Sequence, residues 1–318
     1  MFHNARIGLV IPCYKVKNQL SEVISSIPEW VDGIYLIDDA CPEKSVQYVM
    51  NSVSDSRIKV VYLEKNGGVG YAVKQGYLMA VEGNQDLIVR IDGDGQMDLN
   101  HLADLLMPLI KGEADFSKGN RFFYVEDISK MPKRRIVGNI VLSFMSKFST
   151  GYWDIFDPNN GYNAITSRAL KQLPLDKIDN RYFFESDQLF RLGLNRVKIV
   201  DVPIPAKYGT EVSNLNIFVS VFEFTFKHIR NSLKRIFYNY FLREFNLGSL
   251  EFILGTLLLN FGLLLGSISW IIGMGTGAPT PVSRLILIAM TTLSGLQFIL
   301  GFLAYDMNKQ TSHSAKNS

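Results

Sequence analysis

Short apolar runs alternate with amphipathic stretches through the first 210 residues. Four runs have the length and composition of buried strands: 7–11, 34–37, 58–63 and 86–91. Three stretches between them have the apolar spacing of helices: 19–27, 45–53 and 71–81. Strands that alternate with helices in this way predict an α/β domain with a mainly parallel sheet.

The C-terminal part of the chain has a different pattern. No charged residue occurs within 252–283 or within 285–305. Each stretch can supply the roughly 20 apolar residues that cross a bilayer core. The sequence TGAPTP at 276–281 lies between them and breaks a helix. We predict a transmembrane hairpin with helices at 251–275 and 284–305. A buried hairpin of a soluble domain is the alternative, but neither segment has the polar stripe of a surface helix.

The segment 217–245 mixes aromatic and basic residues, among them Phe222, Phe226 and Phe237. This mixture predicts interfacial amphipathic helices that lie on a lipid bilayer. A helix packed on the soluble core is the alternative. These patterns divide the chain into four parts: a catalytic domain at 1–212, interfacial helices at 213–248, the hairpin at 249–306, and a polar tail at 307–318, which we expect to be disordered from Asn308 onward.

Basic residues are unevenly distributed around the hairpin. They lie before it and after it, at Lys227, Arg230, Lys234, Arg235, Arg243, Lys309 and Lys316. Only Arg284 lies between the two apolar segments. Lysine and arginine accumulate on the cytoplasmic side of membrane proteins. We therefore expect a multi-pass protein of the cell inner (cytoplasmic) membrane, with the catalytic domain and both termini cytoplasmic.

Charge and cysteine content argue against a nucleic-acid-binding protein and against a disulfide-stabilised secreted protein. A formal net charge of +3 gives no sign of a nucleic-acid partner, which would need a clustered basic surface. Two cysteines, Cys13 and Cys41, cannot form a disulfide framework and indicate a reducing compartment. The polar residues 1–6 and the short run 7–11 do not resemble a signal peptide. The oligomeric state stays open, with a homo-oligomer among the alternatives.

Polar residues and glycines follow each predicted strand. The four segments are Pro12-Cys13-Tyr14, Asp38-Asp39, Asn66-Gly67-Gly68 and Asp92-Gly93-Asp94. Parallel sheets bind ligands at the carboxyl ends of their strands, so we expect these segments to form one site. The glycines follow the third strand rather than the first, which argues against a dinucleotide fingerprint.

The two acids Asp92 and Asp94 stand two residues apart after a strand, and Gln96 follows them. Such acids can share one hard cation, and Mg²⁺ or Mn²⁺ completes its shell with substrate phosphates. A cation there would stabilise a diphosphate leaving group. An acidic turn without a metal is the alternative, since the spacing alone is weak.

Taken in order, these segments resemble glycosyltransferase family 2, which has the GT-A fold. The matches are IPCY at 11–14 to "IPxYN", IDDACPE at 37–43 to "VDDGSxD", NGGVGYA at 66–72 to "NxGxGxA", and DGDGQ at 92–96 to "DADxQ". The resemblance covers about residues 1–210, and the ordered set is more specific than any one piece.

Within the family, the chain is similar to the polyprenyl-phosphate branch, which includes dolichyl-phosphate mannose synthases and undecaprenyl-phosphate sugar transferases. The matching segments are GNRF at 119–122, RRIVGN at 134–139, NGYNA at 160–164, YFFESD at 182–187 and VPI at 202–204. Two positions depart from the pattern: Val16 replaces an early glutamate, and Asn163 replaces the arginine of "SGFR".

The resemblance implies an inverting, metal-dependent transfer from a nucleotide sugar, with UDP favoured over GDP, to a polyprenyl phosphate. It implies donor contacts from Pro12, Tyr14, Asp38, Asp39, Asn66, Gly67, Gly70, Asp92 and Glu185. Metal ligands would be Asp92, Asp94 and Gln96, and acceptor-phosphate contacts Arg121, Arg135 and Asn139. The catalytic set would be Asp94, Arg121, Arg135 and Asp187. Two alternatives remain: a family 2 enzyme that extends a glycan, and an inactive membrane scaffold that binds sugar nucleotides.

Overall fold

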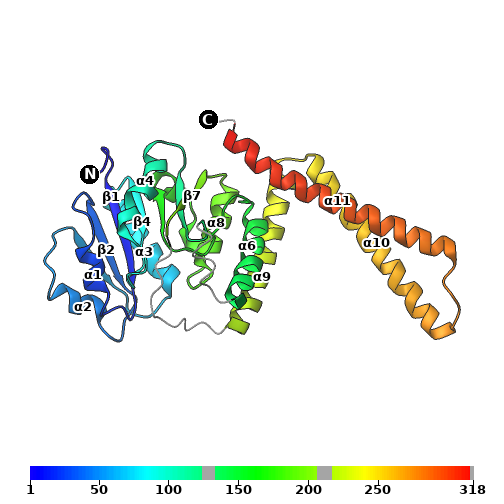
Figure 1. Cartoon of the computed structure of the whole chain (residues 1–318), viewed down its shortest axis with the longest axis horizontal. Helices are drawn as coiled ribbons and strands as arrows, with labels where there is room; N and C mark the ends of the chain where they lie inside the picture. Colours follow the sequence, from blue (N-terminus) through cyan, green and yellow to red (C-terminus); the bar gives the residue numbers. More distant parts are fainter. Residues whose placement is uncertain (124–132, 206–216, 316–318) are drawn as a thin grey trace. The chain divides into compact units, whose positions relative to one another are not determined.

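The computed structural model describes residues 1–123, 133–205 and 217–315 (Figure 1). The chain forms two compact units, Met1–Ser232 and Leu233–Ser318. The domain boundaries expected at 212, 248 and 306 stay predictions.

The first unit contains a seven-stranded mixed sheet in the order β3-β2-β1-β4-β6-β5-β7. Its strands are β1 (Ile7–Cys13), β2 (Gly33–Asp38), β3 (Ile58–Tyr62), β4 (Leu87–Arg90), β5 (Phe116–Asn120), β6 (Asn163–Thr166) and β7 (Ile199–Pro203). Only β6 runs antiparallel to its neighbours. The α/β fold class and the four predicted strands are confirmed. The fully buried pattern of β2 and β4 explains their continuous apolar runs, since central parallel strands are covered on both faces.

Helices cover both faces of this sheet. The described helices of the first unit are α1 (Leu20–Ser25), α2 (Ser45–Met50), α3 (Val69–Glu82), α4 (Leu102–Ile110), α6 (Lys133–Thr150), α7 (Ser167–Lys171), α8 (Phe184–Leu194) and most of α9 (Ile217–Phe237), with short 3₁₀ turns at Leu99–His101 and Leu175–Lys177. Side chains of α1, α2 and α4 form one hydrophobic core, and those of α3, α7 and α8 form the core on the other face.

The sheet topology brings six strand ends to one edge. Strands β1, β2, β3, β4, β5 and β7 share one direction, and β1 lies between β2 and β4. Asp38 pairs in register with Cys13, and Asp92 follows the end of β4 directly beside them. The carboxyl ends of these strands therefore form the edge where the sequence predicts a site.

Helices α6 and α9 lie side by side in the first unit (Figure 1), joined by a 2.8 Å hydrogen bond between Ser149 Oγ and His228 Nδ1. The side of α9 that faces the protein is polar, with His228 and Asn231 buried. The opposite side exposes an apolar stripe that includes Phe222 (78% exposed) and Phe226 (70%). An apolar stripe facing outward is the reverse of a surface helix in a soluble protein.

The second unit contains a π-helix at Tyr238–Arg243 and two long apolar helices, α10 (Leu247–Thr276) and α11 (Val282–Ala315). Both are long and apolar enough to cross a membrane. Asn246 caps α10 in a reciprocal hydrogen-bond pair with Ser249, and Gly277 ends it in the left-handed conformation (φ 66°). The turn falls where the sequence predicts it. We expected the tail from Asn308 onward to be disordered, but α11 continues to Ala315.

Candidate active site

Asp39 joins the end of β2 to the glycine turn before α3. Its carboxylate accepts hydrogen bonds from the backbone N–H groups of Gly67 (2.7 Å) and Gly68 (2.9 Å). The side-chain amide of Asn66 donates to the Asp39 carbonyl (3.3 Å). Asp38 is also buried and accepts from the Cys41 backbone N–H at 2.7 Å. Two segments that the sequence assigns to donor binding are therefore in direct contact, and Asp39 holds the turn in place.

Glycine is required at positions 68 and 70 for different structural reasons. Gly68 has φ +93°, which L-residues rarely adopt, and it is the N-cap residue directly before α3. A Cβ on Gly70 would lie 2.6 Å from the Asp179 carbonyl oxygen and 2.7 Å from the Phe184 side chain. Gly70 thus permits close packing of the 179–184 segment against α3. This contact accounts for the glycine without a nucleotide.

The acids after β4 form a partly open loop. Asp92 has a side chain that is 33% exposed. Asp94 accepts a hydrogen bond from the Gln96 backbone N–H at 3.0 Å, and Gly95 has φ +75°. The Asp92 N–H points to Met97 Sδ at 3.3 Å. The loop therefore holds both carboxylates at the strand end, beside β1 and its Pro12-Cys13-Tyr14 segment, where Tyr14 is exposed.

Arg90, the last residue of β4, binds two acids of this edge at once. Its Nη1 donates to Glu185 Oε1 at 2.5 Å, and its Nη2 donates to Asp92 Oδ1 at 3.2 Å. Burial alone would lower the pKa of Arg90, but the negative charges of Glu185 and Asp92 outweigh this effect. The net shift of the pKa is upward, so the guanidinium stays charged. The sequence analysis missed this residue. A charged side chain inside an otherwise apolar strand was the available signal, because such a residue needs a buried partner.

Arg121, at the end of β5, is paired with an acid that the sequence analysis also missed. Its Nε and Nη2 bind the two carboxylate oxygens of Asp157 at 2.7 and 3.1 Å. The Asp157 side chain is buried, whereas that of Arg121 is 34% exposed. This bidentate pair fixes the guanidinium, in a side chain that stays partly exposed at the edge.

Polar residues of β5 and β7 support the segment that carries Asp157, the partner of Arg121. Lys118 donates to the Asn160 carbonyl, and burial lowers the pKa of Lys118 to about 8. Asp201 accepts from the Phe156 N–H (2.7 Å) and the Asn120 amide (3.2 Å), and burial raises the pKa of Asp201 to about 6. These groups order the 156–160 segment that carries Asp157.

The structure places Asp187 inside the protein. It is 1% exposed. Its Oδ2 accepts from the Asp179 N–H (3.0 Å) and from the Arg191 guanidinium (3.1 and 3.3 Å), and its Oδ1 accepts from the Asn231 amide (3.0 Å). Both oxygens are engaged, which is the pattern of a residue that holds α8, α9 and the 179–181 segment together.

Two predicted residues lie on α6, namely Arg135 and Asn139. The backbone of α6 is described from Lys133, but the side chains of these two residues lie outside the described part of the structure.

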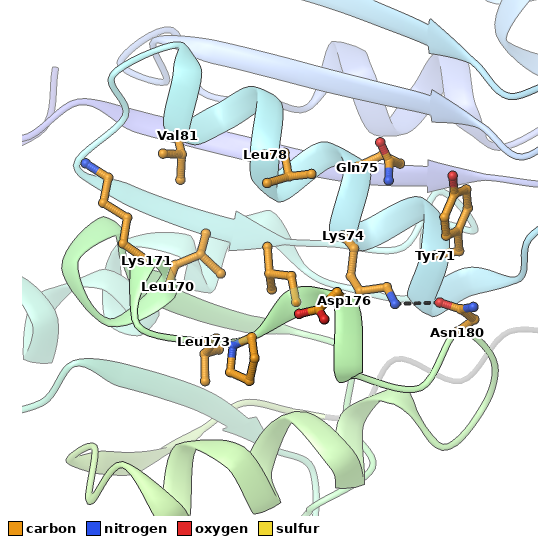
Figure 2. A pocket seen from close by; sticks show the side chains of 12 residues that line it. Tyr71, Lys74, Gln75, Leu78, Val81, Leu170, Lys171, Leu173, Asp176 and Asn180 are labelled. Atoms are coloured by element: carbon orange, nitrogen blue, oxygen red, sulfur yellow. Dashed lines mark hydrogen bonds between the residues drawn. The ribbon is translucent and has the colours of Figure 1, made fainter.

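A hollow of about 660 Å³ lies between α3 and the 170–180 segment (Figure 2). Lys74 extends toward it and donates a 2.5 Å hydrogen bond to Asn180 Oδ1. The rest of the lining is mostly aliphatic, from Leu78, Val81, Leu170, Leu173, Pro174 and Leu175. None of the predicted donor, metal or acceptor residues lines this hollow.

Known proteins of similar sequence belong to the same fold and enzyme class that the sheet and its edge suggest. The family model described as Glycosyl transferase family 2 matches residues 9–177. The chain is 30% identical over 222 residues to the UDP-N-acetylglucosamine–dolichyl-phosphate N-acetylglucosaminyltransferase of Methanococcus voltae, covering 65% of this chain and 87% of the relative. It is 25% identical over 205 residues to the undecaprenyl-phosphate mannosyltransferase of Micrococcus luteus, covering 63% and 82%.

A solved structure of similar fold is that of glucosyl-3-phosphoglycerate synthase from Mycobacterium tuberculosis with Mn²⁺, UDP and phosphoglyceric acid. Its TM-score is 0.55 at 17% identity, covering 73% of this chain and 78% of that one. The fold and the family match together define the class as a glycosyltransferase with the GT-A fold. The chain belongs to glycosyltransferase family 2, and its relatives include polyprenyl-phosphate sugar transferases.

Proposed function

We propose that the protein transfers a sugar from a nucleotide sugar to a polyprenyl phosphate at the cytoplasmic membrane face. The observation that carries this proposal is the joint presence, in the first unit, of acids and an accessible arginine at one sheet edge and an outward apolar stripe on α9. The first feature suits a nucleotide sugar and an anionic acceptor, and the second suits a lipid surface. The names of the relatives from M. voltae and M. luteus support the acceptor class.

The donor site would consist of the residues at the ends of β1, β2 and β4 with the glycine turn: Pro12, Tyr14, Asp38, Asp39, Asn66, Gly67, Gly70, Asp92 and Glu185. Asp39 and Gly70 act on the shape of this site through the contacts described above. We favour UDP over GDP, because the M. voltae relative is named for a UDP-sugar and the M. tuberculosis structure contains UDP.

The oxygen ligands in the loop after β4 fit a divalent cation. Asp92 and Asp94 supply hard oxygen ligands, with Gln96 adjacent. Within the described residues, no three His, Cys, Asp or Glu side chains are gathered for a metal. Mg²⁺ and Mn²⁺ commonly use one or two carboxylates and take their other ligands from phosphates and water. A cation held there would neutralise the charge that develops on the leaving diphosphate.

Arg121, Arg135 and Asn139 would bind the acceptor phosphate. A phosphate monoester is largely anionic near neutral pH, since its second pKa is about 6. Its oxygen can attack the sugar C1 as the bond to the diphosphate breaks, which inverts C1 and needs no strong general base. Arg121 is suited to hold this phosphate, because Asp157 fixes the plane of its guanidinium. We assign Asp187 to holding α8 and α9 in place, since its oxygens are engaged.

The hairpin of α10 and α11 would anchor the protein, and the basic residues flanking it support cytoplasmic termini. Helices α6 and α9 would contact the lipid surface beside the site. Their exposed apolar residues include Ile140 and Phe144 on α6 and Phe226 on α9.

The test is incubation of purified protein with a panel of UDP- and GDP-sugars and a polyprenyl phosphate, followed by detection of glycolipid. We expect product that EDTA abolishes and Mg²⁺ or Mn²⁺ restores, and none from Asp94→Ala. Product in EDTA would remove Asp92, Asp94 and Gln96 from the mechanism. Transfer only to a glycan would replace the acceptor class, and donor binding without any transfer would indicate a scaffold.

A further inference from the structure

Arg90 occupies an unusual position for an arginine. It is 2% exposed, at the end of a central strand, and its guanidinium also lies 5.6 Å from the ring of Phe184. Taking a charged group out of water costs several kcal/mol unless partners compensate it. Its Nε has no hydrogen-bond partner among the described residues. The site therefore does not satisfy Arg90 fully, and a stability role alone would favour a smaller or apolar side chain.

The two partners of Arg90 lie on different elements. Asp92 follows β4, whereas Glu185 is in the first turn of α8. Arg90 lies between the two carboxylates, so its positive charge offsets their mutual repulsion. It also couples the predicted metal loop to the helix that carries Glu185.

The geometry also distinguishes the two oxygens of Asp92. Arg90 binds Oδ1, and Oδ2 faces Gly161, where an added Cβ would lie 2.8 Å from Oδ2 and 3.2 Å from Arg90 Nη2. Gly161 thus lies against Oδ2, where any larger residue would crowd it, and 33% of the Asp92 side chain stays exposed. A carboxylate held through one oxygen offers the other in a fixed direction, as metal ligands do when a neighbouring group orients them.

We propose that Arg90 is a positioning residue that orients Asp92 for one-oxygen binding of the donor's divalent cation and holds Glu185 beside it. The inference rests on the proposed function. Loss of a group that orients a metal ligand typically lowers metal affinity about 10- to 100-fold. Arg90→Met removes the charge at similar length. Arg90→Lys keeps the charge, but a single ammonium cannot match the two-armed contact.

The experiment measures Mn²⁺ binding to the full chain in detergent with UDP present, by electron paramagnetic resonance of free Mn²⁺. We expect half-saturation to rise about 10- to 100-fold in Arg90→Met and less in Arg90→Lys. High Mn²⁺ should restore much of the transfer rate, which it would not do for a variant that is simply unstable. The matched control is Arg168→Met, since Arg168 is an exposed arginine paired with Asp115 and should bind Mn²⁺ as the wild type does.

Unchanged Mn²⁺ half-saturation in both Arg90 variants, with normal binding by the wild type, would overturn the role of Arg90 and leave the proposed function intact. If Arg90→Met does not fold, Arg90→Lys decides: weaker Mn²⁺ binding supports positioning, and wild-type binding reduces Arg90 to charge compensation. Absence of UDP-dependent Mn²⁺ binding by the wild type would overturn the metal site itself and this inference with it.

Discussion

The substitution Asp187→Asn separates a structural role from a catalytic one. The sequence places Asp187 in a motif with Glu185 and suggests catalysis, whereas the structure buries it among donors from three elements. An asparagine there has nearly the same shape, but it loses the charge and turns an N–H₂ group toward groups that themselves donate. Breaking a buried ion pair by changing one partner costs about 3–5 kcal/mol.

A loss of this size has a measurable thermal consequence. For a unit of about 230 residues, each kcal/mol lowers the unfolding midpoint by about 2–4 °C. We therefore expect the apparent midpoint of Asp187→Asn to fall by roughly 6–20 °C. Turnover measured well below that midpoint should fall by much less than the 10²–10⁴-fold typical of a lost general base.

The assay combines thermal unfolding of the purified protein with transfer rates at low temperature. Asp176→Asn is the matched control, because Asp176 is an exposed acid of the neighbouring segment and its change should affect neither quantity. A wild-type midpoint together with a rate loss above about 100-fold would refute the structural role and restore Asp187 as a base.

Three further expectations concern other parts of the chain. Arg135→Lys should reduce transfer steeply while donor binding stays normal, because lysine lacks the bidentate geometry; near-normal transfer would leave Arg135 a surface charge. Burial lowers the pKa of His228 to about 4 from 6.5, so stability present above pH 6.5 is lost as pH falls toward 4, by up to about 3 kcal/mol. The unfolding midpoint of His228→Gln should therefore vary less between pH 7.5 and 5 than that of the wild type, and equal slopes would contradict this. Gly295→Val should loosen the hairpin and raise its protease sensitivity, since a Cβ there would lie 2.4 Å from the Leu259 nitrogen, whereas Gly275→Val, with open space around it, should not.

The sequence predicted the elements whose burial is uniform. Strands β1, β2 and β4 are almost entirely apolar because both faces are covered, and the charged residues Asp38 and Arg90 lie only at the ends of β2 and β4. The two long helices of the second unit were recognised because the stretches 252–283 and 285–305 contain no charged residue. Strands β5 and β6 were not recognised as strands. They contain the buried polar residues Ser117, Lys118 and Asn163, and each is tolerated because a specific partner binds it.

The sequence indicated which segments end at one edge of the sheet, but not how their side chains are connected. The motif segments end at one edge because parallel strands end together, which spacing alone can indicate. The partners of the charged residues come from distant segments: Arg121 binds Asp157, and Arg90 binds Glu185 across 95 residues. The amphipathic pattern of 217–245 likewise predicted a helix with one polar and one apolar side, but not which side packs on the protein. In α9 the polar side packs on the protein.

The polar side of α9 also connects this helix to the glycine turn at the carboxyl edge of the sheet. Lys227 binds Asp179 at 2.6 Å, on the segment whose next residue, Asn180, accepts the Tyr71 N–H at 3.0 Å. A Cβ on Gly68 would lie 2.6 Å from the Asn180 carbonyl oxygen. The same short segment therefore supports α9 on one side and the glycine turn on the other. Because both rest on it, displacing α9 would disturb the turn that Asp39 holds. The proposed membrane contact and the proposed donor binding would therefore share their structural support.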